Sequence, residues 1–300
     1  MGHLRILSYN VKLIPPYAKL AIRPGLCTNG WWEDGGGRWS DGERSKRIEA
    51  MLVRSGADVI VLQELFQEGA RARFREALAA VGYSFSTGPL GTGVLSEDSG
   101  LFVASRVPIV EHAFEEFDAK AGEDALSDKG IAHAVVDVSE RWPGIDHLEL
   151  FGVHLQSGYA QHAVRKKQLG QLASYVGRRV TQAKRDRTAV ATLGDFNVVG
   201  EAPDQVQPSW EYEQLLRILR GAEDLGKPGE FTWDGVVNEW MTQEDDESRK
   251  RLDYIFAFES VLALGSVRAL TATARIDPFL SDGRHLSDHF AVVADLTPAL

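Results

Sequence analysis

The stretch Thr-Ala-Val-Ala-Thr-Leu-Gly-Asp-Phe-Asn, residues 188–197, sets two polar side chains directly after a β-branched and apolar run. Such a run predicts a buried strand. Asp195 and Asn197 then stand where the strand ends, and a buried polar side chain costs free energy unless a partner satisfies it. Two interpretations follow: the pair forms an Asx turn that serves the backbone alone, or it faces a site that binds a charged ligand.

Working outward along the chain, the same pattern recurs. Polar residues stand at the ends of five other apolar runs: Asn10, Glu64, His154, Asp253, and the pair Asp288 and His289. Carboxylates, amides and imidazoles at the ends of neighbouring strands can surround one pocket, and oxygen ligands of this kind bind hard cations. The conjunction of these residues, more than any single one, predicts a cation-binding functional pocket.

Each residue also has a structural interpretation. Glu64 could cap a helix or stand at a solvated edge, and His154 could be a satisfied core histidine. Asp253 could pair with Arg249 or Arg251. The segment Ser-Asp-His at 287–289 is the least open to such an interpretation, because it sets a carboxylate beside a titratable base just before an apolar run.

Periodicity and turn signals give the expected elements. Strands are predicted over residues 4–11, 58–64, 100–105, 131–138, 147–154, 188–195, 252–258, 267–272 and 290–296. Helices are predicted over residues 41–56, capped by Asp41, and over 70–81, 161–182 and 210–220. Solid apolar strands with a few helices are typical of an α+β sandwich. Since no Pro-rich or Ser-rich linker interrupts it, residues 1–300 are predicted to form a single domain.

Composition narrows the class of protein. With 44% hydrophobic and 25% charged residues, the chain has the composition of a soluble globular protein. Its net charge of −10 argues against a protein that coats nucleic acid, which needs clustered Lys and Arg. The one cysteine, Cys27, excludes an intrachain disulfide, and no signal peptide is visible. We therefore expect a cytoplasmic protein, or the mature form of a secreted one, that is a monomer.

The motifs, taken in order along nearly the full chain, resemble the endonuclease/exonuclease/phosphatase superfamily. The matching stretches are Leu-Ser-Tyr-Asn (7–10), Leu-Gln-Glu (62–64), Ser-Gly-Leu (99–101), His-Leu-Gln (154–156), Gly-Asp-Phe-Asn (194–197), Leu-Asp-Tyr-Ile (252–255) and Ser-Asp-His (287–289). The resemblance implies a four-layer α/β/β/α sandwich of two mixed sheets flanked by helices, and metal-dependent phosphoester hydrolysis.

Three stretches are similar to the bacterial neutral sphingomyelinases in particular: residues 124–130, residues 154–157, and residues 232–255 with Thr-Trp-Asp and Asn238. In the first, Asp124 and Lys129 are five residues apart as in that branch, although Lys129 could be an ordinary exposed lysine at a turn. The resemblance implies a phospholipid substrate with a choline headgroup, sphingomyelin being cleaved to ceramide and phosphocholine. Trp233 could offer its ring to the quaternary ammonium.

The resemblance also implies how a metal is bound. Glu64 would be the direct ligand of Mg²⁺, for which Mn²⁺ or Co²⁺ can substitute, with Asn10 beside it and Asp288 supporting the metal shell. His154 would contact the phosphate or the leaving oxygen. Lys129 would add positive charge where the transition state is negative.

The remaining implied roles concern the attacking water. Asp195 and Asn197 would position the water and a nonbridging oxygen. His289 would be the general base, because imidazole titrates near neutral pH. Asp253 would accept a hydrogen bond from the other ring nitrogen and so fix the tautomer.

Two features depart from known branches. Repair nucleases of the superfamily tend to have an acidic residue two positions after the first asparagine, where this chain has Lys12. Secreted bacterial sphingomyelinases enter the bilayer with an aromatic hairpin near the C-terminus, where residues 267–287 offer only Phe279. A Gly-rich loop carries three aromatic residues instead: Trp31, Trp32 and Trp39. They could provide peripheral membrane contact, or pack beneath the loop or line the pocket.

Other functions are distinguishable. A nuclease on this fold would need a basic groove beside the pocket, against which the net charge argues. An inositol-polyphosphate or phosphoinositide-type phosphatase would bring a pocket rich in Lys and Arg. A catalytically inactive scaffold, the alternative from another class, would not need every polar position filled as it is here.

Overall fold

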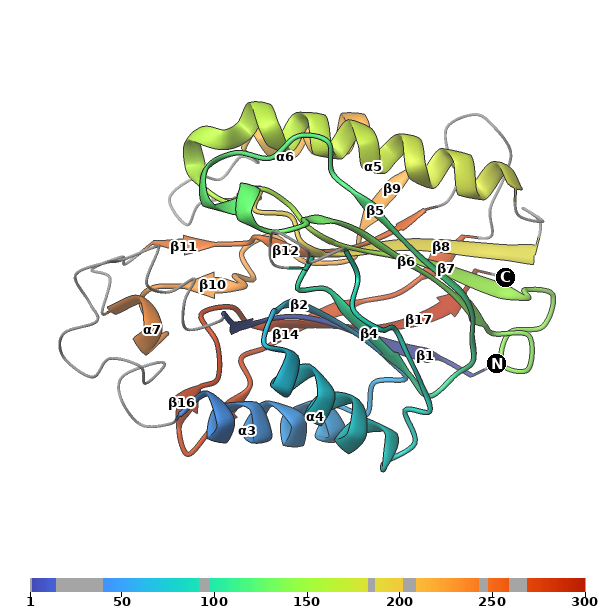
Figure 1. Cartoon of the computed structure of the whole chain (residues 1–300). Helices are drawn as coiled ribbons and strands as arrows, with labels where there is room; N and C mark the ends of the chain where they lie inside the picture. The colour runs from blue at the N-terminus through green and yellow to red at the C-terminus, as the bar shows by residue number, and fades with distance from the viewer. Residues whose placement is uncertain are drawn as a thin grey trace.

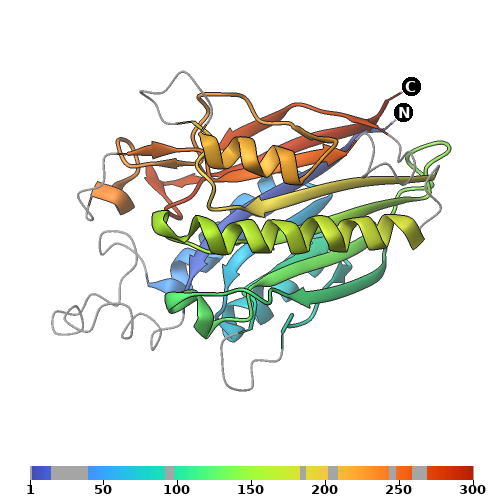
Figure 2. The same ribbon diagram turned by 90° about the horizontal axis from the view of Figure 1, so that it is seen from above.

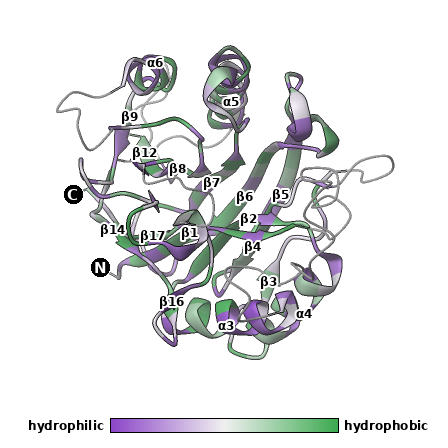
Figure 3. Cartoon of the chain, turned by 90° about the vertical axis from the view of Figure 1, so that its left-hand side faces the viewer, coloured by the Kyte–Doolittle hydropathy of each residue, from purple (hydrophilic) through white to green (hydrophobic). Residues whose placement is uncertain are grey.

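Two β-sheets packed face to face form the centre of the molecule. The structure, a computed structural model, describes residues 2–14, 40–91, 98–182, 187–201, 209–242, 248–258 and 269–299. Helices cover the outer face of each sheet, and the view along the strands shows four layers (Figures 1 and 3). The α+β fold class and its two mixed sheets flanked by helices, predicted from the sequence, are confirmed.

The first sheet has the order β13-β17-β1-β2-β4-β3, with β14 also paired to β17. Its strands are β1 (Leu4–Leu13), β2 (Val59–Leu65), β3 (Phe85–Ser86), β4 (Phe102–Ser105), β13 (Leu270–Thr271), β14 (Ala274–Asp277) and β17 (Ala291–Pro298). β1 and β2 are parallel, with Asn10 opposite Gln63, so both strands end at the same edge. β17 is antiparallel to β1 and therefore begins at that edge.

The second sheet has the order β5-β6-β7-β8-β12-β9. Its strands are β5 (Ile109–Glu116), β6 (Gly130–Asp137), β7 (His147–His154), β8 (Thr188–Asp195), β9 (Ala222–Asp224) and β12 (Asp253–Phe258). Parallel pairing of β7 and β8 sets His154 opposite Asp195. Antiparallel pairing of β12 with β8 sets Asp253 opposite the same aspartate. Three of the predicted site residues are thus neighbours because of strand register alone.

Helices and small hairpins complete the described residues. The helices are α3 (Asp41–Arg54), α4 (Glu68–Ala79), α5 (His162–Gln182), α6 (Trp210–Ile218) and α7 (Glu239–Thr242), with 3₁₀ turns η2 (Gly122–Leu126) and η3 (Tyr159–Gln161). The hairpins are β10 (Trp233–Asp234) with β11 (Arg249–Lys250) and β15 (Leu280–Ser281) with β16 (Arg284–His285). Seen from above, α5 lies along the strands of the second sheet (Figure 2).

Apolar residues form three clusters at the interfaces between these layers, and the ribbons of both sheets are largely coloured as hydrophobic (Figure 3). Val61 and Val103 of the first sheet share one cluster with Ala132 and Leu150 of the second. Two further clusters lie under α3 and α4 and under α5 and α6. Strands buried on both faces need no polar alternation, which explains the solid apolar runs of the sequence.

The spacing between the sheets is tight at Gly152 of β7. A Cβ atom added there would lie 2.7 Å from Cγ1 of Val61 on β2. Real Cβ atoms do not approach that closely, so glycine at this position allows the two sheets to meet.

Some predicted elements need correction. The cap of α3 is Ser40 and not Asp41, because the Ser40 hydroxyl accepts from the Glu43 amide while the Glu43 carboxylate accepts from the Ser40 amide. β5 was not predicted: it is an edge strand of mixed polar and apolar residues, of which Ile109 and Phe114 are partly buried against the core. The strand expected at 267–272 is limited, within the described residues, to Leu270–Thr271.

Trp31, Trp32 and Trp39 lie outside the described residues. None of the described helices combines the length and hydropathy that a membrane crossing requires.

Candidate active site

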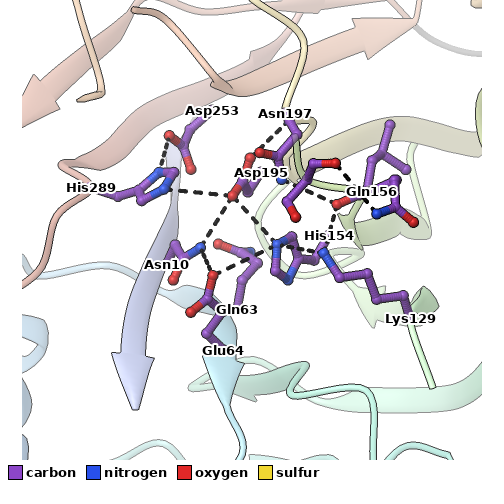
Figure 4. Close-up of polar contacts among 12 residues, drawn as sticks. Asn10, Gln63, Glu64, Lys129, His154, Gln156, Asp195, Asn197, Asp253 and His289 are labelled. Atoms are coloured by element: carbon purple, nitrogen blue, oxygen red, sulfur yellow. Dashed lines mark hydrogen bonds and ion pairs between the residues drawn. The ribbon is translucent and has the colours of Figure 1, made fainter. Parts of the chain in front are cut away.

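The polar residues predicted from strand ends come together at one end of the sandwich, and Figure 4 shows those that lie around Asp195. Both sheets contribute, because the carboxyl ends of β1, β2, β7 and β8 lie at this end. We call this the site end. The structure brings together all nine predicted residues, in three linked groups around Asp195, Lys129 and Asp288.

Asn10 joins the two sheets across the site. Its Nδ2 donates to Glu64 Oε1 at 2.8 Å and to Asp195 Oδ2 at 3.1 Å. Glu64 has φ of 56°, a left-handed conformation uncommon for a non-glycine residue. Strained backbone of this kind persists where the surroundings impose it, and it is concentrated at functional sites.

His289 and Asp253 form a buried pair. His289 Nδ1 lies 2.8 Å from Asp253 Oδ2, and its Nε2 lies 3.7 Å from Asp195 Oδ2. The Asp253 amide donates to Thr232 Oγ1, which fixes the start of β12.

The alternative that Asp253 pairs with Arg249 or Arg251 is wrong. Arg249 pairs with Asp234 at 2.7 Å, and Arg251 pairs with Glu201 at 2.7 Å. Both arginines are therefore engaged with other carboxylates.

Lys129 is buried against His154, which rules out the exposed-turn interpretation of this lysine. Its side chain is 1% exposed, and Nζ lies 3.0 Å from His154 Nε2. The ammonium also donates to the Leu155 carbonyl at 2.8 Å and lies 3.1 Å from Asp124 Oδ1. Burial and the neighbouring Lys129 charge lower the pKa of His154 well below its usual value, so this imidazole is neutral.

The structure agrees with both interpretations of Asn197. The backbone amide of Asn197 donates to Asp195 Oδ1 at 2.8 Å, which is the Asx-type turn expected from Gly-Asp-Phe-Asn. Its Nδ2 donates to the Leu155 carbonyl at 3.1 Å, beside the Lys129 ammonium. The turn thus holds the Asn197 side chain within the site.

Asp288 faces a different partner. Its Oδ2 lies 2.6 Å from Lys12 Nζ, and its Oδ1 accepts from Ser287 Oγ at 3.1 Å. Asn238 Nδ2 donates to the carbonyls of Ser287 and Asp288, which anchors the segment before β17.

This arrangement of strand-end residues matches a known family. The model of the Endonuclease/Exonuclease/phosphatase family matches residues 7–289, nearly the whole chain. The chain belongs to this family.

Individual relatives are similar over most of the chain. A Sphingomyelinase C of Leptospira interrogans is 28% identical, over 96% of this chain and 51% of that protein, so the chain spans about half of its length. The crystal structure of Sphingomyelinase C from Streptomyces griseocarneus has a TM-score of 0.72 at 23% identity and covers 98% of this chain and 99% of that one. A beta toxin mutant from Staphylococcus aureus with bound magnesium ions has a TM-score of 0.73 at 20% identity, covering 98% and 99%.

The electrostatics of this family member's site favour a bound cation. Burial raises the pKa of Asp195 to about 7, and desolvation together with the Asp288 charge raises the pKa of Glu64. Burial opposes ionisation of His289, but Asp253 and Asp195 outweigh it and raise the pKa of this imidazole. Carboxylates in such surroundings are stabilised when a cation binds among them.

The donor atoms fit a divalent ion. Glu64, His154 and Asp195 present ligand atoms within 4.8 Å of one another, and so do Asp195, Asp253 and His289. Carboxylate oxygens with an adjacent amide are ligands suited to Mg²⁺. Asp288, predicted to support the metal shell, is in neither group, and its partner is Lys12.

Sequence reasoning did not find several residues that shape the site. Thr232, whose Oγ1 accepts from the Leu252 and Asp253 amides, and Lys12 had no predicted role there. Trp233, offered as a face for a quaternary ammonium, has Lys250 Nζ 4.0 Å from its ring centroid, so one face is already occupied by a cation.

Proposed function

We propose that this chain is a metal-dependent phosphodiesterase that hydrolyses the headgroup of a phospholipid, cleaving sphingomyelin to ceramide and phosphocholine. One observation carries the proposal: Asp195 lies between the Glu64–Asn10 pair and the His289–Asp253 pair, with Lys129 and His154 beside it (Figure 4). A cation-binding group, a base and a buried positive charge thus surround one small volume.

The His289–Asp253 pair activates water in this proposal. Nδ1 of His289 is occupied by Asp253, so Nε2 is the ring atom that faces Asp195 and the pocket. A cation bound at Glu64 and Asp195 would offset the carboxylate charge that raises the pKa of His289, so that the ring is neutral in the loaded site. Nε2 then takes the proton from the attacking water, and the Asp253 carboxylate stabilises the imidazolium that forms. Asp195 orients the water through its Oδ2 atom.

Lys129 and His154 act on the phosphate. The Lys129 ammonium is buried, so water screens its charge little, and it stabilises the negative charge that builds on the phosphoryl oxygens. Neutral His154 offers a ring nitrogen beside the leaving oxygen.

The metal is proposed to be Mg²⁺, with Mn²⁺ or Co²⁺ as substitutes. Glu64, Asn10 and Asp195 would hold it. When bound, it supplies Lewis-acid polarisation of the phosphoryl group and stabilises the leaving oxygen. The candidate ligand groups and the magnesium ions bound by the beta toxin mutant support this choice.

The lipid substrate is favoured over nucleic acid by two observations. The chain has a net charge of −10, whereas binding along a phosphate backbone needs clustered positive charge. Proteins with sphingomyelinase names are similar to it over most of its length. A zwitterionic choline headgroup is compatible with an acidic protein.

The experiment compares substrates in parallel. Purified protein with Mg²⁺ is given sphingomyelin in detergent micelles, supercoiled plasmid, or a phosphoinositide. We expect release of phosphocholine that stops with EDTA and in Glu64→Ala, with the plasmid intact. Glu213→Ala, which changes an exposed carboxylate on α6, is the matched control and should retain activity.

The other outcomes redirect the proposal. Plasmid nicking without phosphocholine would assign the same site to a nuclease, and phosphate release from the phosphoinositide would assign it to a phosphatase. Phosphocholine release that persists in Glu64→Ala would refute the metal assignment.

A further inference from the structure

The ion pair between Lys12 and Asp288 places a cation of the chain inside the site. Lys12 Nζ lies 2.6 Å from Asp288 Oδ2, and the two side chains are 24% and 13% exposed. Lys12 therefore serves Asp288 as a counter-ion.

Lys12 is held in this position by its backbone. Its φ is 47°, a left-handed value, and its amide donates to Asn10 Oδ1 at 3.1 Å. Its carbonyl accepts from Arg44 Nη2 at 2.6 Å. Arg44 is fully buried and also donates to the carbonyls of Val11 and Leu286. One guanidinium thus ties the end of β1, including Lys12, to the segment that carries Asp288.

The position of this pair divides the carboxylates of the site. Glu64, His154 and Asp195 form one group whose ligand atoms are close enough to share a divalent ion. The other such group shares Asp195 with it, and its remaining members, Asp253 and His289, are bonded to each other. Asp288 is in neither group. Asp288 has Lys12 on one oxygen and Ser287 on the other. A divalent ion on the Asp288 side would meet the ammonium at short range, and like charges at that distance repel strongly in a partly buried site.

We propose that Lys12 takes the place of a second divalent ion, so that the site binds a single one, on the Glu64, Asn10 and Asp195 side. The inference rests on the proposed function only in that this side binds a divalent cation. It makes Lys12 the residue that sets metal stoichiometry, a property separate from the identity of the substrate.

The test measures Mn²⁺ binding to metal-stripped protein without substrate, by titration calorimetry and by the electron paramagnetic resonance signal of free Mn²⁺. The wild type should bind a single ion. Lys12→Met removes the charge and should bind a second Mn²⁺ ion. The dissociation constant of this second ion should be at least about tenfold lower in the variant than in the wild type, a change of about 1.4 kcal/mol in binding free energy. Lys12→Arg keeps the charge and should remain at one.

Two further variants locate the second ion. The double variant Lys12→Met with Asp288→Asn should return to one ion, because it lacks the carboxylate that would hold the second. Lys250→Met is the matched control: it removes a lysine charge over Trp233 at the β10–β11 hairpin, and its stoichiometry should stay at one. Lys12→Gln replaces Lys12→Met if thermal melting shows that the latter does not fold.

Binding of two ions by the wild type, or of one by a folded Lys12→Met or Lys12→Gln, would overturn the inference. A wild type that binds one ion but releases no phosphocholine would refute the proposed substrate and leave the inference standing. A wild type that binds none would refute both.

Discussion

The two ends of the sandwich differ in how their carboxylates are paired. At the end where both termini lie (Figure 1), which we call the terminal end, carboxylates are matched by arginines. Arg5 binds Asp295 at 2.7 Å, Arg141 binds Asp58 at 2.9 Å, and Arg187 pairs with Asp146. At the site end, Glu64 and Asp253 lie near Asp195 and share the imidazoles of His154 and His289 with it, while Asp288 pairs with a lysine.

The difference separates charges that hold the fold from charges arranged for chemistry. The hydrogen bond from Arg5 lowers the pKa of Asp295, so the folded state favours the ionised form. Burial raises the pKa of Asp195, so the folded state disfavours its ionised form. Opposed pKa shifts of this kind are typical of functional sites, which sacrifice stability for reactivity.

The largest effect is expected when the base is removed from the site end. His289→Asn should lower kcat/KM for the phospholipid by about 10²- to 10⁴-fold, because proton transfer from water then lacks its acceptor. Phosphocholine release under steady-state conditions measures this. Asp58→Asn, at the terminal end, should lower thermal stability and leave kcat/KM unchanged, and a comparable loss of activity in both variants would contradict the division.

A smaller effect concerns stability and pH. The pKa of Asp195 is raised from 3.8 to about 7 in the folded protein, so the unfolded chain loses this proton first as pH rises. The stability contributed by Asp195 is therefore full below about pH 4 and declines up to about pH 7. Without metal, the free energy of unfolding of Asp195→Asn, compared with that of the wild type, should therefore rise as pH increases from about 4 to about 7. The gain should be a few kcal/mol at most, and the altered hydrogen bond from Asn10 reduces it.

Thermal melts in EDTA at pH 4 and pH 8 measure this difference. Adding Mg²⁺ should raise the melting temperature of the wild type more than that of Asp195→Asn, because the variant has lost a proposed ligand. A variant that is less stable than the wild type by the same amount at both pH values would show that Asp195 carries no ionisation penalty.

The smallest effect is expected at the terminal end. Arg5→Met removes a partly exposed pair with Asp295 and should lower the free energy of unfolding by about 1 kcal/mol or less, since water and salt screen it. Urea denaturation at low and high salt measures the loss, which should shrink at high salt. A loss of several kcal/mol would contradict this expectation and would mean that the ion pair contributes more than apolar packing to holding β1 against β17.

The sequence predicted well which polar residues stand at strand ends. An apolar run followed by a polar residue implies that the residue lies at a strand terminus, and parallel pairing of β1 with β2 and of β7 with β8 brings those termini together. Register places His154 beside Asp195 without further help. The residue pattern along each strand and the pairing of neighbouring strands both place these residues at the same edge, so their position can be predicted from the sequence.

Contacts set by tertiary packing could not be predicted in this way. Lys12 was noticed only as a departure from other branches, because its partner Asp288 is 276 residues away. The left-handed backbone of Glu64 has no signal in residue type, since glutamate does not favour it. β5 has no regular apolar alternation because it is a half-exposed edge strand whose register with β6 shifts between Ile109 and Glu111.

The contact between Gly152 and Val61 has a consequence for protein engineering. Glu64 belongs to β2 and His154 to β7, so the two halves of the site lie on separate sheets. A larger residue at position 152 would push the two sheets apart only two residues before His154, and would so change the distance between the two halves of the site. Core redesign in this family member is therefore also active-site redesign, and libraries that repack the interior should be screened for altered cation-size preference as well as for folding.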